Sequence, residues 1–82
     1  MTQPEQMLEL YQFEACPFCS QVREKLSDLG IDFIARQVDK NDRERVEEVS
    51  GQTGVPVLVD PNTDTVMSES EDIVDYIDER YG

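Results

Sequence analysis

The sequence predicts an α/β fold in which a four-stranded mixed sheet is flanked by three helices, in the order β-α-β-α-β-β-α. Two observations indicate this fold: β-branched and other apolar residues gather in short clusters that alternate with segments of helical spacing, and turn-forming residues separate them. With 82 residues the chain has room for one small hydrophobic core. We therefore expect a single domain over residues 1–82, with residues 1–6 flexible.

The first forty residues predict a strand, a helix and a second strand. A weakly alternating pattern over 7–11 indicates the first strand, and apolar residues at helical spacing over 17–29 indicate the helix. Pro17 suits the first position of a helix, and Gly30 is typical of the position after its end. A second apolar cluster within 31–38 indicates a strand, which a right-handed crossover would place parallel to the first.

The second half predicts a charged helix, a hairpin and a final helix. Asn41 or Asp42 can cap the charged helix, which ends near Ser50–Gly51. The β-branched run 55–59, a strong turn signal and the segment 65–67 predict the hairpin. The final helix carries apolar residues at helical spacing that should pack on the sheet, namely Ile73, Ile77 and Tyr81.

The chain is strongly acidic, with 19 Asp and Glu against 7 Lys and Arg, and a net charge of −12. This charge makes nucleic acid and anionic membranes poor partners. No apolar run approaches the about 20 residues that cross a bilayer, and no leader sequence is visible, so we expect a cytoplasmic protein. Because salt screens repulsion between like charges, we favour a halophilic cytoplasm as the reason for this surface.

The two cysteines, Cys16 and Cys19, stand where the first strand is predicted to pass into the first helix. In a reducing cytoplasm such a pair indicates redox chemistry rather than a structural disulfide. A structural zinc site needs four Cys or His ligands, which two cysteines and no histidine cannot supply within one chain. Two cysteines buried only as small apolar residues would not favour a strand-to-helix junction.

The start of a helix would give the two thiols different roles. Cys16 precedes the first turn, where unpaired backbone N–H groups and the positive end of the helix dipole favour a thiolate. We therefore expect Cys16 to be the nucleophile. Cys19, one turn further and less exposed, would attack the mixed disulfide at Cys16 and release the product as a thiol.

Three motifs occur in register with these elements: Cys-Pro-Phe-Cys at 16–19 after a strand, Gly-Val-Pro-Val at 54–57 before the hairpin, and Glu-Ser-Glu-Asp-Ile at 69–73 opening the last helix. With these motifs the chain resembles the glutaredoxins of the thioredoxin superfamily, from residue 8 to about 81, and also the thioredoxin-like domain of glutathione transferases. The resemblance implies a thioredoxin-like fold. It also implies a disulfide oxidoreductase of electron transport and cell redox homeostasis, which reduces protein disulfides and mixed disulfides with glutathione or a related small thiol.

The resemblance further implies a groove that holds the small thiol beside Cys16. Phe18 would form an aromatic wall of this groove. A cis Val55–Pro56 bond would turn the N–H and C=O of Val55 towards the cysteine moiety of the ligand, which would pair with them as an added strand does. The plain structural alternatives are a phenylalanine exposed only because the helix starts there, and an ordinary strand entry with a trans bond.

The opening of the last helix would complete this groove. Backbone N–H groups near Ser70 and Glu71 would hold a γ-glutamyl carboxylate, and Glu69 would meet its α-amino group. The alternative is a capping box between Ser68 and Glu71, which would stabilise the helix without binding a ligand. The paired glycines that often precede this helix in the family are replaced here by Ser68 and Glu69.

The chain also departs from the family beside the cysteines. Many glutaredoxins carry a lysine three residues before the nucleophile, where this chain has Phe13, and Glu14 adds a negative charge that disfavours the Cys16 thiolate. The glycine carboxylate of glutathione would therefore lose one cationic partner, for which the sequence offers Arg43 or Arg45 without placing them. γ-Glutamylcysteine, which lacks that glycine, is the second candidate for the reducing co-substrate.

Other functions stay open from the sequence. A thioredoxin-like reductase fed by a flavoprotein would not need the groove. A homodimeric carrier would hold a [2Fe–2S] cluster between Cys16 of two chains and two small thiols, but Pro17 and the resolving Cys19 argue against it. A transferase would need a helical second domain. We expect a monomer with no bound cofactor and no metal site, whose partners are disulfide-containing proteins and the small thiol.

Overall fold

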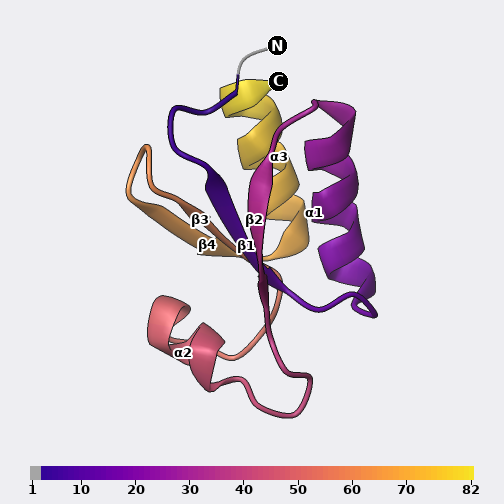
Figure 1. Ribbon diagram of the computed structural model, residues 1–82, viewed down its shortest axis with the longest axis vertical. Helices are drawn as coiled ribbons and strands as arrows, with labels where there is room; N and C mark the ends of the chain where they lie inside the picture. Colours follow the sequence, from indigo (N-terminus) through magenta and orange to yellow (C-terminus); the bar gives the residue numbers. More distant parts are fainter. Residues whose placement is uncertain (1–2) are drawn as a thin grey trace.

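The computed structural model describes residues 3–82 and confirms the predicted architecture (Figure 1). In chain order the elements are β1 (Leu8–Gln12), α1 (Pro17–Asp28), β2 (Phe33–Gln37), α2 (Glu44–Ser50), β3 (Val57–Asp60), β4 (Thr65–Ser68) and α3 (Ser70–Tyr81). Within residues 3–82, no helix is long and apolar enough to cross a membrane.

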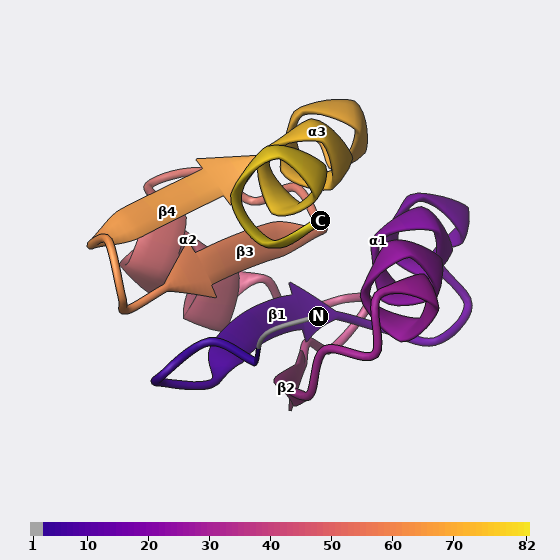
Figure 2. The same ribbon diagram turned by 90° about the horizontal axis from the view of Figure 1, so that it is seen from above.

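The four strands form one mixed sheet in the order β2-β1-β3-β4. β1 runs parallel to β2, as the predicted crossover through α1 requires, and antiparallel to β3, which pairs with β4 in the predicted hairpin. Figure 2 shows that α1 and α3 lie together on one side of the sheet and α2 on the other. The ends of β1 and the starts of α1, β3 and α3 consequently meet at one end of the molecule, where the cysteines lie.

Each face of the sheet has its own apolar core. The core beneath α1 and α3 is built from Leu8, Leu10, Val22, Leu26, Ile31, Leu58, Ile73 and Ile77. The smaller core beneath α2 is built from Tyr11, Val38, Val46 and Val57. Because side chains alternate between the two faces of a strand, β1 and β3 supply both cores. The two cores together fix where the helices begin relative to the sheet.

The element boundaries differ from the predictions by a few residues, for local reasons. β2 is shorter than the apolar segment 31–38 because Ile31 and Val38 lie outside the ladder, although both are buried. The N-cap residue of α2 is Arg43, without a side-chain cap bond, and not the expected Asn41 or Asp42. Asp42 Oδ1 nevertheless accepts a hydrogen bond from the Glu44 N–H at 3.1 Å. Gly51 ends α2 with a φ of 76°, in the left-handed region that glycine adopts at low cost.

A buried carboxylate ties α3 to the hairpin at the end of the molecule opposite the cysteines. Asp60 Oδ2 accepts hydrogen bonds from the hydroxyls of Tyr76 and Tyr81, both at 2.6 Å, and Oδ1 accepts from the backbone and side chain of Asn62. Burial raises the pKa of Asp60, but these hydrogen bonds together outweigh it and hold the pKa below its ordinary value. The ionised carboxylate therefore helps to fix the direction of α3.

The flexibility expected of residues 1–6 stays a prediction, and residues 1–2 lie outside the described part of the chain. Two glutamines of this segment do make contacts. Gln3 Oε1 accepts a hydrogen bond from the Asp32 N–H at 2.9 Å, and its side-chain amide donates to the Gly30 carbonyl. The Gln6 N–H donates to Asn62 Oδ1 at 2.9 Å.

Candidate active site

Cys16 is the N-cap residue of α1, as the sequence predicts. Its backbone is extended, Pro17 occupies the first helical position, and the Cys19 N–H donates a hydrogen bond to Cys16 Sγ at 3.4 Å. The sulfur of Cys16 therefore lies at the N-terminus of the helix, where unpaired N–H groups and the helix dipole stabilise a negative charge. Cys16 is 6% exposed and Cys19 fully buried, so Cys19 is the less accessible thiol, as predicted.

The environment of Cys19 holds that thiol in its protonated form. Burial is the main cause that raises the pKa of Cys19, and the hydrogen bond with the Cys16 side chain adds to it, giving a value of about 12. A backbone contact with Phe13 and the positive charge of Arg23 act in the opposite direction. The Cys19 thiol therefore stays protonated near neutral pH.

The negative charge of Glu14 beside Cys16 faces a cation that sequence reasoning missed. Arg23 Nη2 lies 3.8 Å from Glu14 Oε1 and donates to the Glu14 carbonyl at 3.4 Å. The side chain of Gln12, which is fully buried, accepts from Arg23 and donates to Glu14 Oε2 at 3.1 Å. The only sequence signal for this cluster is the spacing of Arg23 four residues after Cys19, which places both on one face of α1.

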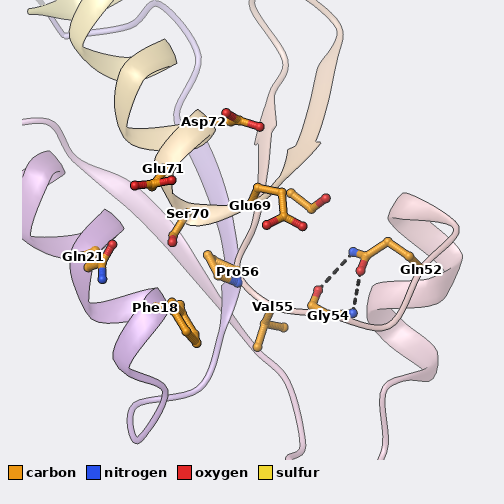
Figure 3. A pocket seen from close by; sticks show the side chains of 11 residues that line it. Phe18, Gln21, Gln52, Gly54, Val55, Pro56, Glu69, Ser70, Glu71 and Asp72 are labelled. Atoms are coloured by element: carbon orange, nitrogen blue, oxygen red, sulfur yellow. Dashed lines mark hydrogen bonds between the residues drawn. The ribbon is translucent and has the colours of Figure 1, made fainter.

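A groove of about 500 Å³ opens beside the start of α1 (Figure 3). It is lined by Phe18, Gln21, Gln52, Gly54, Val55, Pro56, Ser68, Glu69, Ser70, Glu71 and Asp72. The structure therefore brings together all the residues that the family resemblance assigned to a small-thiol groove. The thiols themselves lie just outside the lining, at the start of the helix that carries Phe18, which is 57% exposed. Gln21, Gln52 and Asp72 also line the groove, although no sequence pattern indicated them.

The Val55–Pro56 peptide bond is cis, so the expectation from the resemblance is confirmed and the trans alternative is wrong. Within residues 3–82, neither the N–H nor the C=O of Val55 makes a hydrogen bond. A backbone N–H or C=O that is shielded from water and makes no hydrogen bond costs free energy, so a ligand that pairs with it is favoured. Val55 thus presents one free donor and one free acceptor at the wall of the groove.

The N-terminus of α3 forms the opposite wall and has no side-chain cap. The N-cap residue is Glu69, with a φ of 73° and no side-chain cap bond, so the capping box between Ser68 and Glu71 is wrong. The first hydrogen bond of the helix runs from the Ile73 N–H to the Glu69 carbonyl at 3.0 Å. The N–H groups of the preceding residues, Ser70, Glu71 and Asp72, have no partner within residues 3–82. Free N–H groups at a helix start are suited to bind a carboxylate.

Glu69 occupies the position where the family often has glycine. A φ of 73° lies in the region that disfavours residues with a Cβ atom, so Glu69 is held in a strained conformation. This conformation lets the chain pass directly from β4 into α3. It also leaves the Glu69 side chain in the lining of the groove.

The two candidate arginines have different surroundings. The Arg43 guanidinium lies 5.3 Å from the centre of the Phe13 ring and donates from Nη1 to the Thr53 carbonyl at 3.0 Å. Arg45 instead lies 5.4 Å from the centre of the Tyr11 ring and donates to the Gln37 carbonyl. Arg43 therefore connects the residue that replaces the family lysine with the loop that carries Val55. Within residues 3–82, no cluster of three or more His, Cys, Asp or Glu is arranged to hold a metal ion.

Comparison with known families agrees with this geometry. The family model described as the glutathione S-transferase N-terminal domain matches residues 10–82. An uncharacterized glutaredoxin-like 8.6 kDa protein in the rubredoxin operon of Clostridium pasteurianum is 34% identical over 68 residues, which cover 79% of this chain and 91% of that protein. Glutaredoxin 3 of Escherichia coli K12 is 37% identical over 53 residues, covering 62% of this chain and 64% of that protein.

A solved structure gives the same fold. Glutaredoxin 2 from Salmonella typhimurium, determined in complex with glutathione, superimposes with a TM-score of 0.82 and 28% sequence identity. The match covers 90% of this chain and 34% of that protein, so the chain spans about a third of its length. The four-stranded mixed sheet with three helices is thus the thioredoxin-like fold that the sequence predicted.

The surroundings of the two thiols predict a large difference in reactivity. At about pH 8, iodoacetamide should alkylate Cys16 and leave Cys19 unmodified, because the buried Cys19 thiol remains protonated. Mass spectrometry of peptides from the fully reduced, native protein would check this, and protein denatured in guanidinium is the control in which both thiols react. Equal labelling of both cysteines in the native protein would contradict the assignment.

Proposed function

Since this chain belongs to the family of glutathione S-transferase N-terminal domains and is a glutaredoxin-like thiol–disulfide oxidoreductase of the thioredoxin superfamily, we propose that it reduces protein disulfides and mixed disulfides between proteins and glutathione. One observation carries the proposal. Free backbone groups of Val55 and of the α3 N-terminus face a groove at the start of α1, where Cys16 lies.

The proposed ligand matches these free groups one by one. The γ-glutamyl carboxylate binds the N–H groups of Ser70 and Glu71, where the dipole of α3 adds to the attraction. The carboxylate of Glu69 pairs with the ligand's α-amino group. The cysteinyl part pairs with the N–H and C=O of Val55, as an added strand would. Phe18, which is more than half exposed, forms the apolar wall beside the reacting sulfurs.

The proposed reaction begins with two thiol–disulfide exchanges. The Cys16 thiolate attacks the glutathione sulfur of the mixed disulfide, so that the protein substrate leaves as a thiolate, takes up a proton and is reduced. A new disulfide then joins Cys16 to glutathione. The thiolate of a second glutathione attacks the glutathione sulfur of that disulfide, giving oxidised glutathione and regenerating the Cys16 thiolate.

Cys19 provides the second route, which reduces protein disulfides. Attack of Cys16 on a protein disulfide gives a mixed disulfide between Cys16 and the substrate. Cys19 then loses its proton and attacks Cys16 Sγ, so that the substrate leaves as a dithiol and an intramolecular disulfide forms. Two glutathione molecules reduce this disulfide. Because burial keeps the Cys19 thiol protonated, Cys19 does not compete with Cys16 for the incoming disulfide.

Serine variants of the two cysteines test the proposal. Cys16→Ser should abolish reduction of a glutathionylated peptide, because no nucleophile remains at the helix start. Cys19→Ser should retain that activity and lose glutathione-dependent reduction of a protein disulfide. Turnover is measured at low and near-saturating potassium chloride, and a gain with salt would support the proposed halophilic cytoplasm.

The alternatives give different results in the same experiment. Wild-type protein that is inactive with glutathione at every salt concentration would contradict the proposal. Turnover only with a flavoprotein reductase would identify a thioredoxin-like reductase. Conjugation of glutathione to an aromatic electrophile would identify a transferase. A brown protein from anaerobic expression that loses its colour on Cys16→Ser would identify the cluster carrier.

The identity of the small thiol depends on what binds its glycine carboxylate. We propose that Arg43 supplies the positive charge that a lysine supplies in many glutaredoxins and that Phe13, at the lysine's position, lacks. The aromatic ring and the Thr53 carbonyl hold the guanidinium beside the loop that precedes Val55. From there it attracts the glycine carboxylate of a ligand whose cysteinyl part is paired with Val55. This arrangement favours glutathione over γ-glutamylcysteine as the co-substrate.

A change at Arg43 should remove this preference. Arg43→Ala is expected to lower kcat/KM for glutathione about two- to fivefold at low salt, since a half-exposed ion pair is weak, and to leave γ-glutamylcysteine unaffected. Arg45→Ala is the matched control, because it removes an arginine stacked on another ring. An equal effect of Arg43→Ala on both thiols, or an equal effect of both variants on glutathione, would contradict the assignment.

A further inference from the structure

The side chain of Gln52 takes up both backbone hydrogen-bonding groups of Gly54. The Gly54 N–H donates to Gln52 Oε1 at 2.6 Å, and Gln52 Nε2 donates to the Gly54 carbonyl at 3.0 Å (Figure 3). Nε2 also lies 3.0 Å from Ser50 Oγ, which donates to the Val46 carbonyl within α2 at 2.8 Å. A chain of hydrogen bonds therefore leads from the last turn of α2 to the residue before Val55.

The glycine at position 54 is explained by this contact and not by its backbone conformation. The glycines with positive φ are Gly30 and Gly51, so Gly54 is in a conformation open to other residues. A Cβ atom at position 54, however, would lie 2.9 Å from Gln52 Oε1, closer than such atoms approach. Apart from its two chain neighbours, the atoms within 4 Å of that Cβ belong to Gln52. Gly54 therefore leaves room for the Gln52 amide.

From this geometry we propose that Gln52 is a positioning residue for the bound thiol. It occupies the N–H and C=O of Gly54 and so holds the next residue, Val55, with its own N–H and C=O free for the ligand. Gln52 and Gly54 also line the groove themselves. This inference rests on the proposed function, because it assigns Gln52 a role in the binding of the cysteinyl part of glutathione.

The hydrogen bonds between Gln52 and Gly54 matter because they lie in the loop that joins α2 to β3. Residues 51–56 form neither helix nor strand, and they precede the pairing of Val57 with β1 and β4. A loop without these hydrogen bonds would have to be ordered each time a ligand binds, which costs affinity. The side-chain amide of Gln52 already orders the loop in the free protein. Loss of the Gln52 side chain is therefore expected to weaken ligand binding and not to change the chemistry of Cys16.

The close contact predicts how two substitutions combine. Gln52→Ala removes the hydrogen bonds between Gln52 and Gly54 directly. Gly54→Ala removes these hydrogen bonds indirectly, because the new methyl group displaces Gln52 Oε1. In a chain that already carries Gln52→Ala, the same methyl group at position 54 has no other atom within 4 Å outside its two chain neighbours. The two losses should therefore not add, as is typical of residues that act through one contact.

The test is the steady-state reduction of a glutathionylated peptide by wild type, Gln52→Ala, Gly54→Ala and the double variant. Each single variant should raise KM for this substrate about three- to tenfold, the loss expected for one or two hydrogen bonds, and the double variant should match Gln52→Ala. The kcat value and the pH dependence of Cys16 alkylation should not change. Gln3→Ala is the matched control, because Gln3 pairs in the same way with the backbone of Gly30 and Asp32.

The outcomes separate this inference from the proposed function. Wild-type protein without turnover would overturn both. Normal wild-type turnover with an unchanged KM in Gln52→Ala, additive losses in the double variant, or losses expressed in kcat or in the alkylation profile would overturn the role of Gln52 alone. If Gln52→Ala does not fold, Gly54→Ala still decides the matter, because it keeps every side chain of the loop.

Discussion

The groove depends on backbone hydrogen-bonding groups that the fold leaves unpaired where several elements begin. At the start of α1, one such N–H is taken up by Cys16 Sγ. At the start of α3, the N–H groups of Ser70, Glu71 and Asp72 have no partner within residues 3–82, and the same holds for both groups of Val55. Unpaired N–H groups attract anions. One physical property therefore underlies both proposed anion sites, the one for the Cys16 sulfur and the one for the carboxylate of the ligand.

The rest of the molecule keeps these groups aligned. The shared core beneath α1 and α3 sets the two helix starts side by side, and Asp60 anchors the far end of α3 through Tyr76 and Tyr81. The chain has a net charge of −12 and only 7 Lys and Arg residues, so the positions of these cations matter. Among its few cations, Arg23 faces Glu14 beside the thiols and Arg43 lies over Phe13. Two of the few cations thus lie near the candidate site, although the groove itself is lined by Glu69, Glu71 and Asp72 and, within residues 3–82, by no Lys or Arg.

Features with a local signal could be predicted from the sequence, and features made by distant side chains could not. Periodicity and turn residues predicted the elements, and the position of Cys16 before Pro17 predicted its place at the helix start. The capping box failed because Ser68 is the last residue of β4 and pairs with Val57 of β3, so the helix begins only after it. Contacts of the Arg43–Phe13 and Gln52–Gly54 kind depend on where α2 and its following loop pack, which no local pattern encodes.

Nuclear magnetic resonance of the Cys19→Ser protein joined to glutathione at Cys16 tests the central claim most directly. If the unpaired groups bind the glutathione moiety, the amide protons of Val55, Ser70 and Glu71 will show the largest shifts and slower exchange with solvent than in the free protein. Shifts confined to residues beside Cys16 in α1, with the amides of Val55 and the α3 N-terminus unchanged, would contradict the account.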